Sequence, residues 1–111
     1  MVPKRAYVLG ISGSPRRGGN TETMLDEVLR GAQSADASVE KIVLRGMEIS
    51  PCLACAKIKR DGTCMLDDDM QPLYEKGRKA DAVVLASPVF FGSVTAQTKT
   101  MIDRFNCWWL A

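Results

Sequence analysis

The chain has 111 residues and a net charge of +2, and apolar residues make up 46% of it. This length fits a single domain, residues 1–111, whose apolar content is sufficient for a buried core. The small net charge gives no reason to expect nucleic acid or a membrane surface as a partner, and no stretch approaches the ~20 apolar residues of a membrane span. We therefore expect a cytoplasmic protein.

The chain contains four cysteines and no histidine. The lack of histidine excludes catalytic triads that depend on an imidazole and every metal site with a histidine ligand. Cysteines of cytosolic proteins are more often redox, metal or core residues than structural disulfides.

The first half of the chain predicts two strands joined by a helix. Residues 6–12 are a short apolar run that ends in Gly, Ser and Pro, which predicts a buried strand. Residues 21–32 have apolar side chains at helical spacing, and Asn20 or Thr21 can cap this helix. Residues 39–44 predict the second strand. The apolar helical positions are Met24, Leu25, Val28, Leu29 and Ala32.

An irregular stretch, residues 45–67, precedes the second helix. Asp68 can cap that helix, because Pro72 would then fall near its first turn, where a missing N–H is tolerated. Residues 82–87 are the most apolar segment and show no alternation, which predicts a strand covered on both faces of a parallel sheet. The last helix, residues 94–105, would turn inward Val94, Thr98, Met101, Ile102 and Phe105.

Strands and helices alternate along the chain, which predicts an open α/β fold with right-handed crossovers. Such sheets bind ligands at the carboxyl ends of their strands, where the strand order reverses. If the first and third strands are neighbours there, the loops after Ser12 and Ser87 flank one crevice.

The first of these loops has the composition of a phosphate-binding loop. Its glycines allow close backbone approach, its hydroxyl and amide side chains offer hydrogen bonds, and Arg16 and Arg17 add charge. The helix that follows attracts anions at its N-terminus. Neither GxxxxGK[ST] nor GxGxxG is present, so a phosphomonoester fits better than a dinucleotide. The other interpretation is a solvated turn.

The second loop, residues 86–93, places Phe90 and Phe91 at the end of a buried strand. These rings either pack on a flat ligand ring or belong to the core. Gly92 and Ser93 offer backbone donors to a ligand.

Cys52, Cys55 and Cys64 stand at C-x2-C-x8-C spacing, and Cys107 is remote. This spacing suits metal binding or redox chemistry. Because a Cys₄ iron–sulfur site needs a fourth ligand, a cluster requires Cys107 or a partner chain. Reduced thiols or a labile disulfide are the expectation, with these three cysteines kept as candidate cluster ligands.

Three blocks resemble the NAD(P)H-dependent FMN reductases, in particular the branch near the iron–sulfur flavoproteins. They are GSPRRGGNTETML, PCLACAKIKRDGTCMLDDDMQPLYEK and ADAVVLASPVFFGSVTAQTKTMIDR, and the similarity spans residues 7–104. The resemblance implies an FMN cofactor with NAD(P)H as co-substrate. It also implies a phosphate site and a set of residues along the ribityl chain and isoalloxazine: Ser12, Ser14, Arg16, Asn20 and Thr21 for the phosphate, and Pro88, Val89, Phe90, Phe91, Gly92 and Ser93 for the rest.

The family's flavodoxin-like fold is a doubly wound parallel sheet of strand order 2-1-3-4-5. Compared with that fold, we expect three βα units in this sequence, in the strand order 2-1-3, without the last two strands. The third strand would then be an apolar strand at the edge of the sheet, where its free backbone groups can pair with another chain. We therefore expect a homo-oligomer that buries residues 82–87 or the Trp108-Trp109 end.

The function implied is an oxidoreductase that passes electrons from NAD(P)H through FMN to a flavin, quinone or other small-molecule acceptor. No catalytic side chain is assigned, because the cofactor performs the chemistry. Two alternatives stay open: a flavin-binding electron carrier without nicotinamide activity, and a truncated, non-enzymatic remnant.

Overall fold

The computed structural model describes residues 4–54 and 61–109. Within these residues a single parallel sheet has the order β2-β1-β3, which confirms the predicted flavodoxin-like order 2-1-3. Its strands are β1 (Tyr7–Ser12), β2 (Ser38–Val43) and β3 (Ala82–Ala86). The helices are α1 (Asn20–Ser34), α2 (Met70–Lys79), α3 (Ala96–Arg104) and α4 (Asn106–Trp109).

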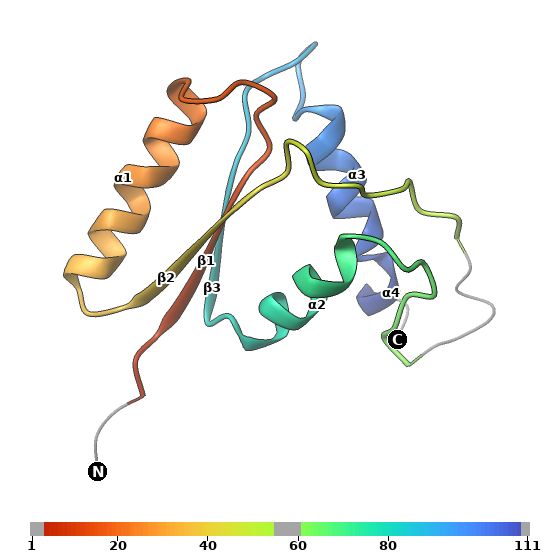
Figure 1. The fold of residues 1–111 in the computed structure, drawn as a ribbon, viewed down its shortest axis with the longest axis horizontal. Helices are drawn as coiled ribbons and strands as arrows, with labels where there is room; N and C mark the ends of the chain where they lie inside the picture. Colours follow the sequence, from red (N-terminus) through yellow and green to blue (C-terminus); the bar gives the residue numbers. More distant parts are fainter. Residues whose placement is uncertain (1–3, 55–60, 110–111) are drawn as a thin grey trace.

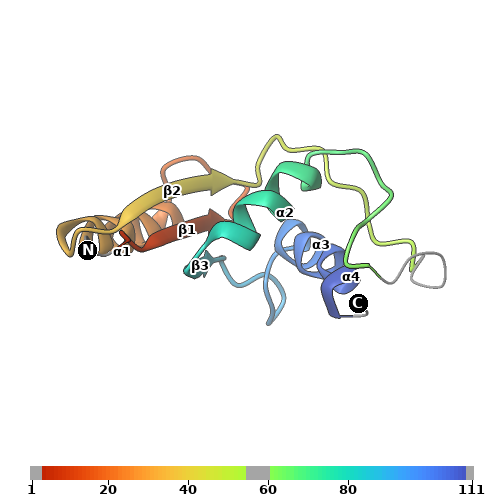
Figure 2. The same cartoon turned by 90° about the horizontal axis from the view of Figure 1, so that it is seen from below.

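The helices lie in two layers around the sheet. Helix α1 covers one face, and α2, α3 and α4 lie on the other (Figure 1). Figure 2 shows the same arrangement from below, with α2 and α3 adjacent and α4 continuing from α3. No helix in the described part of the chain is long and apolar enough to cross a membrane.

The central strand β1 separates two apolar clusters, because its side chains alternate between the faces. Leu9 and Ile11 pack toward α2 and α3, whereas Val8 packs toward α1. The first cluster also contains Leu44, Met70, Leu73, Tyr74 and Met101; the second also contains Leu25, Leu29 and Ala37. Burial on both faces of β1 explains its unbroken apolar sequence.

The apolar face of α1 is narrower than its sequence predicts. Leu25 and Leu29 are buried, but Met24 and Val28 are 69% and 49% exposed. The helix lies very close to β1, since a Cβ on Gly10 would be 2.8 Å from Leu29 Cδ1. At this distance only one row of side chains, Leu25 and Leu29 at i and i+4, contacts the sheet. Met24 and Val28, each one position earlier, point about 100° away from it.

The prediction that residues 82–87 are covered on both faces is wrong. Val83 and Leu85 are 55% and 41% exposed, because β3 lies at the edge of the sheet and the buried cluster on that face is centred on β1. In α3 the inward residues are Thr98, Met101 and Arg104, while Val94 and Ile102, also expected inside, are exposed. The homo-oligomer stays a prediction.

Gly31 of α1 offers a simple test of the helix. It is exposed, and an added Cβ would meet no atom within 4 Å. Gly31→Ala is therefore expected to raise the free energy of unfolding by about 0.5–1 kcal/mol, because alanine has the higher helix propensity. Urea denaturation measures the change. Gly46→Ala is the matched control: Gly46 has φ +84°, so the same substitution should destabilise, and a loss of stability in Gly31→Ala would contradict the helix.

Candidate functional site

The loops that follow β1 and β3 meet at the carboxyl edge of the sheet. The Gly13 N–H donates to Ala86 O at 2.8 Å, and Thr95 Oγ1 donates to Gly13 O at 2.7 Å. Between the loops lies a cavity of about 190 Å³. Its lining residues are Ser14, Pro15, Arg16, Gly19, Asn20, Thr21, Pro88 and Phe90. The two loops therefore flank one crevice, as their positions in the sequence predict.

Helix α1 opens onto this cavity with an uncapped N-terminus. Its N-cap is Gly19, so the predicted cap by Asn20 or Thr21 is wrong, and no side chain caps the helix. The first N–H groups of a helix have no acceptor within the helix, and the helix dipole makes them attractive to anions. Because they cap nothing, the side chains of Asn20 and Thr21 are left to line the cavity.

The Ser14–Arg16 turn brings a positive charge to the same place. Ser14 Oγ accepts from the Arg16 N–H at 3.1 Å and donates to Arg16 O at 3.3 Å, which fixes the turn. The Arg16 side chain then lies over Gly19, since a Cβ built on Gly19 would be 3.8 Å from Arg16 Nε. A guanidinium and a helix N-terminus thus face the same cavity.

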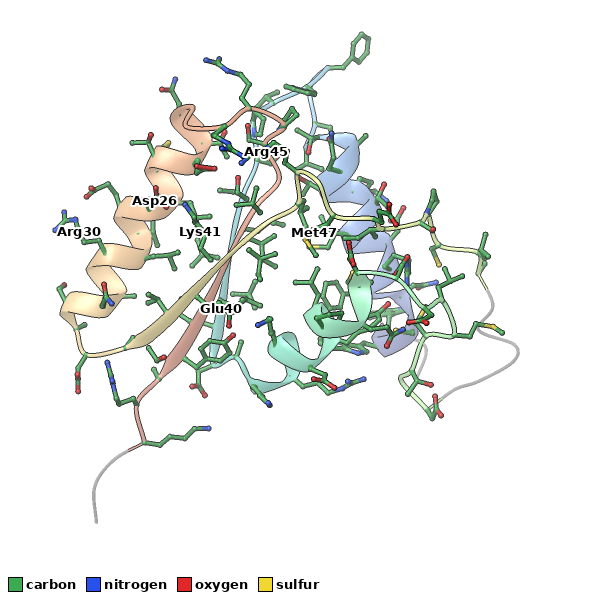
Figure 3. The ribbon with its side chains drawn as sticks, viewed as in Figure 1. Asp26, Arg30, Glu40, Lys41, Arg45 and Met47 are labelled. Carbon is green, nitrogen blue, oxygen red and sulfur yellow. The ribbon has the colours of Figure 1, made fainter. Side chains whose placement is uncertain are left out.

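The charges on the neighbouring strand are already paired. Lys41 of β2 reaches Asp26 of α1 at 2.9 Å (Figure 3). Arg45, beyond the end of β2, lies 3.8 Å from Glu22. In contrast, neither Arg16 nor Arg17 has an ion-pair partner within residues 4–54 and 61–109. The positive charge at the loop is therefore available to a ligand.

These groups suit the phosphate of a phosphomonoester such as FMN. A dianion would receive hydrogen bonds from the first turn of α1 and from Asn20 and Thr21, with a charge-assisted bond from Arg16, while Ser14 holds the turn that carries Arg16. The residues present thus fit the phosphate of the implied cofactor. The same observations argue against a merely solvated turn.

The second loop folds into a tight turn. Phe90 and Ser93 exchange both backbone hydrogen bonds, at 2.9 and 3.1 Å, around Phe91 (φ +49°) and Gly92 (φ +77°). Phe91 is fully exposed and Phe90 is 49% exposed, so neither ring belongs to the core. Phe90 lines the cavity, whereas Phe91 projects into solvent.

The structure brings six of the eleven predicted cofactor residues into one cavity: Ser14, Arg16, Asn20, Thr21, Pro88 and Phe90. Ser12 is buried beneath them, and its hydroxyl accepts from the Ser14 N–H at 3.4 Å. Val89, Phe91, Gly92 and Ser93 lie outside the cavity and are exposed. Gly19, one of the loop glycines expected to allow close approach of the backbone to a ligand, also lines the cavity, whereas sequence reasoning missed Pro15.

The candidate cluster ligands lie in a different region. Cys52 and Cys64 are half-buried free thiols, as is Cys107, and Cys55 lies outside the described residues. In the described part of the chain no three acidic or cysteine side chains converge as a metal site. The Cys64 thiol instead lies 3.5 Å from Arg104 Nη2.

Arg104 anchors this cysteine segment to α3, and sequence reasoning missed it. Its buried guanidinium donates to both carboxylate oxygens of Asp68, at 2.6 and 3.0 Å, and to Ser50 O at 2.9 Å. Hydrogen bonds from Arg104 lower the pKa of Asp68 to about 2. Burial raises the pKa of the Cys64 thiol, but hydrogen bonds from Leu66, Tyr74 and Arg104 outweigh it and hold that pKa below its usual value.

Comparison with known proteins gives one family and a consistent set of relatives. A sequence model described as "NADPH-dependent FMN reductase" matches residues 6–110. An iron–sulfur flavoprotein of Methanocaldococcus jannaschii is 41% identical over 97 residues, covering 87% of this chain and 50% of that protein. One of Methanosarcina thermophila is 38% identical, with 87% and 51% covered. The chain spans about half the length of these curated relatives.

Two solved structures share the fold. A flavone reductase is 32% identical and superposes with a TM-score of 0.70, over 89% of this chain and 29% of that one. An NADH:FMN oxidoreductase in its apo form superposes with a TM-score of 0.67 over 88% of this chain and 49% of its own. At 20% identity, the second likeness concerns the fold alone.

Proposed function

Because the chain belongs to the family of NADPH-dependent FMN reductases, we propose that it binds FMN in the cavity between the β1 and β3 loops. It then passes electrons from NAD(P)H to a flavin, quinone or other small-molecule acceptor. The observation that carries the proposal is the uncapped N-terminus of α1, with Arg16 lying over Gly19. Both features suit a phosphate dianion, and FMN differs from riboflavin by that group.

The residues of the chain would bind the cofactor and orient it. Arg16, Ser14 and the first turn of α1 would hold the phosphate and so fix one end of the cofactor. Pro88 and Phe90 form the opposite wall, against which the ribityl chain would lie. Bound FMN supplies the chemistry, which is acceptance of a hydride and release of electrons. No side chain is required as acid or base for the hydride step, which agrees with a chain that has no histidine.

The visible spectrum of the purified chain tests this function. We expect flavin absorbance, either as isolated or after addition of FMN, that bleaches when NAD(P)H is added without oxygen. Flavin absorbance that NAD(P)H leaves unchanged would favour an electron carrier. A colourless protein that takes up no FMN would contradict the proposal.

Arg16→Ala tests the phosphate assignment. We expect the affinity for FMN to fall about 10-fold, because a charge-assisted hydrogen bond is lost, while the affinity for riboflavin changes little. Quenching of flavin fluorescence measures both. Arg17→Ala is the matched control, since the neighbouring Arg17 does not line the cavity; an equal loss of both ligands in Arg16→Ala would reject the assignment.

A further inference from the structure

Three hydroxyl side chains lie behind the cavity and contribute nothing to its lining: Ser87, Thr95 and Thr98. Thr95 and Thr98 are completely buried. Buried hydroxyls need hydrogen-bond partners, so their arrangement indicates what they hold in place. Thr95 is the N-cap of α3 and Thr98 lies in its first turn, whereas Ser87 directly follows β3 at the start of the loop.

Thr95 contacts both loops of the site. Its hydroxyl donates to Gly13 O at 2.7 Å, across 82 positions of sequence, and its backbone N–H donates to Ser87 Oγ at 3.0 Å. Ser87 Oγ in turn donates to Pro88 O at 2.8 Å. Gly13 directly precedes Ser14, which lines one wall of the cavity. Ser87 directly precedes Pro88, which lines the opposite wall.

The direction of each hydrogen bond follows from the number of protons. A threonine hydroxyl has one proton, and that of Thr95 goes to the Gly13 carbonyl, which can only accept. Thr98 Oγ1, 2.8 Å away, must therefore donate to Thr95 Oγ1, which also accepts from the Thr98 N–H at 3.2 Å as the N-cap of α3. Every donor and acceptor of the Thr95 side chain is thus engaged, and its position is fixed by α3.

We propose that Thr95 is a positioning residue for the flavin site: its hydroxyl sets the separation between the Ser14–Thr21 wall and the Pro88–Phe90 wall. This inference rests on the proposed function. The consequence is that a residue outside the cavity controls how well the phosphate of FMN is held. Ser14 follows Gly13 directly and is hydrogen-bonded to the backbone of Arg16, so a displaced Gly13 displaces Arg16 from the phosphate.

The test compares Thr95→Val with Thr95→Ser. Valine has nearly the same shape but leaves Gly13 O without its donor, whereas serine keeps the hydroxyl. We expect the ratio of FMN affinity to riboflavin affinity to fall about 10-fold in Thr95→Val and to stay within about 3-fold in Thr95→Ser. Thr100→Val is the control, because Thr100 also belongs to α3 but lies outside this hydrogen-bond chain.

A second readout needs no flavin. Amide hydrogen exchange over residues 10–19 of the flavin-free protein should accelerate in Thr95→Val and not in Thr95→Ser. If Thr95→Val does not fold, Ser87→Ala replaces it, since this change removes the acceptor of the Thr95 N–H, and the affinity ratio should fall in the same direction.

An unchanged ratio of FMN affinity to riboflavin affinity in a folded Thr95→Val protein would overturn the inference. An equal fall of this ratio in Thr95→Ser and Thr95→Val would overturn it too. In both cases a wild type that prefers FMN to riboflavin would leave the proposed function intact. A wild type without that preference would overturn the phosphate assignment, and this inference with it.

Discussion

Replacing Arg104 with methionine is expected to lower the free energy of unfolding by about 3–5 kcal/mol, the usual cost of removing one partner of a buried ion pair. The Arg104 side chain is buried, and its partner Asp68 is 13% exposed. Without the guanidinium, Asp68 keeps a charge with little solvent, and Ser50 O loses its donor. Urea denaturation at neutral pH measures the loss. Arg30→Met is the control, because its ion pair with Glu27 is largely exposed and screened by solvent, so its loss should leave the urea midpoint close to that of the wild type.

The same ion pair predicts a pH dependence with a definite sign. The pKa of Asp68 is lowered to about 2 in the folded protein, so its contribution of roughly 2 kcal/mol is present above the unfolded pKa near 4 and is lost as pH falls toward 2. The stability difference between wild type and Arg104→Met should therefore be largest near pH 7 and shrink below pH 4. A difference that stays constant down to pH 2 would contradict this ion pair.

Gly13→Ala is expected to cost about 3 kcal/mol of stability, at the upper end of what overpacking costs. A Cβ at this position would lie 1.7 Å from Thr98 Oγ1 and 3.0 Å from Thr98 Cβ, which is far inside contact distance. Thr98 must move, and the hydrogen bonds of Thr95 with Gly13 and with Thr98 are then disturbed. Thermal or urea unfolding measures the loss, and FMN binding should fall with it.

Two further variants make this prediction specific. Gly13→Ala combined with Thr98→Ala should recover part of the lost stability, because the clashing hydroxyl is gone and the two residues are in contact. Gly19→Ala should cost less, about 1 kcal/mol at most, because a Cβ there would lie 3.8 Å from its nearest neighbour and only the N-cap preference for glycine over alanine is lost. If Gly13→Ala and Gly19→Ala have the same stability, the close packing of Gly13 against Thr98 is wrong.

The sequence predicts β1 and the first loop well because their signals are local. An apolar run ending in Gly-Ser-Pro marks the end of a central strand, and the dense glycines, hydroxyls and arginines mark a loop that can hold an anion. Six predicted residues do converge on one cavity. The alternation of strands and helices predicts an α/β fold, and the family resemblance then predicts the strand order 2-1-3.

The exposed residues could not be predicted in this way, because burial depends on neighbours that are distant in sequence. Val83 and Leu85 read as core, yet their exposure follows from the place of β3 at the edge of the sheet. Arg104 shows the opposite difference, because it is buried although arginine is normally a surface residue. Its burial depends on the ion pair with Asp68, 36 positions earlier. Helical spacing alone places Arg104 on the buried face of α3, three residues after Met101, whereas the charge of arginine favours the surface.

The cap of α1 differs for a chemical reason. Asn20 and Thr21 are better N-cap residues than glycine in isolated helices, so intrinsic preference favours them. The helix instead begins after Gly19, which leaves its first N–H groups and the Asn20 and Thr21 side chains facing the cavity. Departure from local preference at this point is typical of a binding site.

The phosphate site is tested most directly by titrating the purified wild-type chain with FMN and, separately, with riboflavin. We expect one FMN per chain, bound at least about 10-fold more tightly than riboflavin, because the phosphate gains a charge-assisted hydrogen bond and the free N–H groups of α1. Equal affinities, or no binding of FMN at all, would contradict the claim that the loops after β1 and β3 form a site for the FMN phosphate.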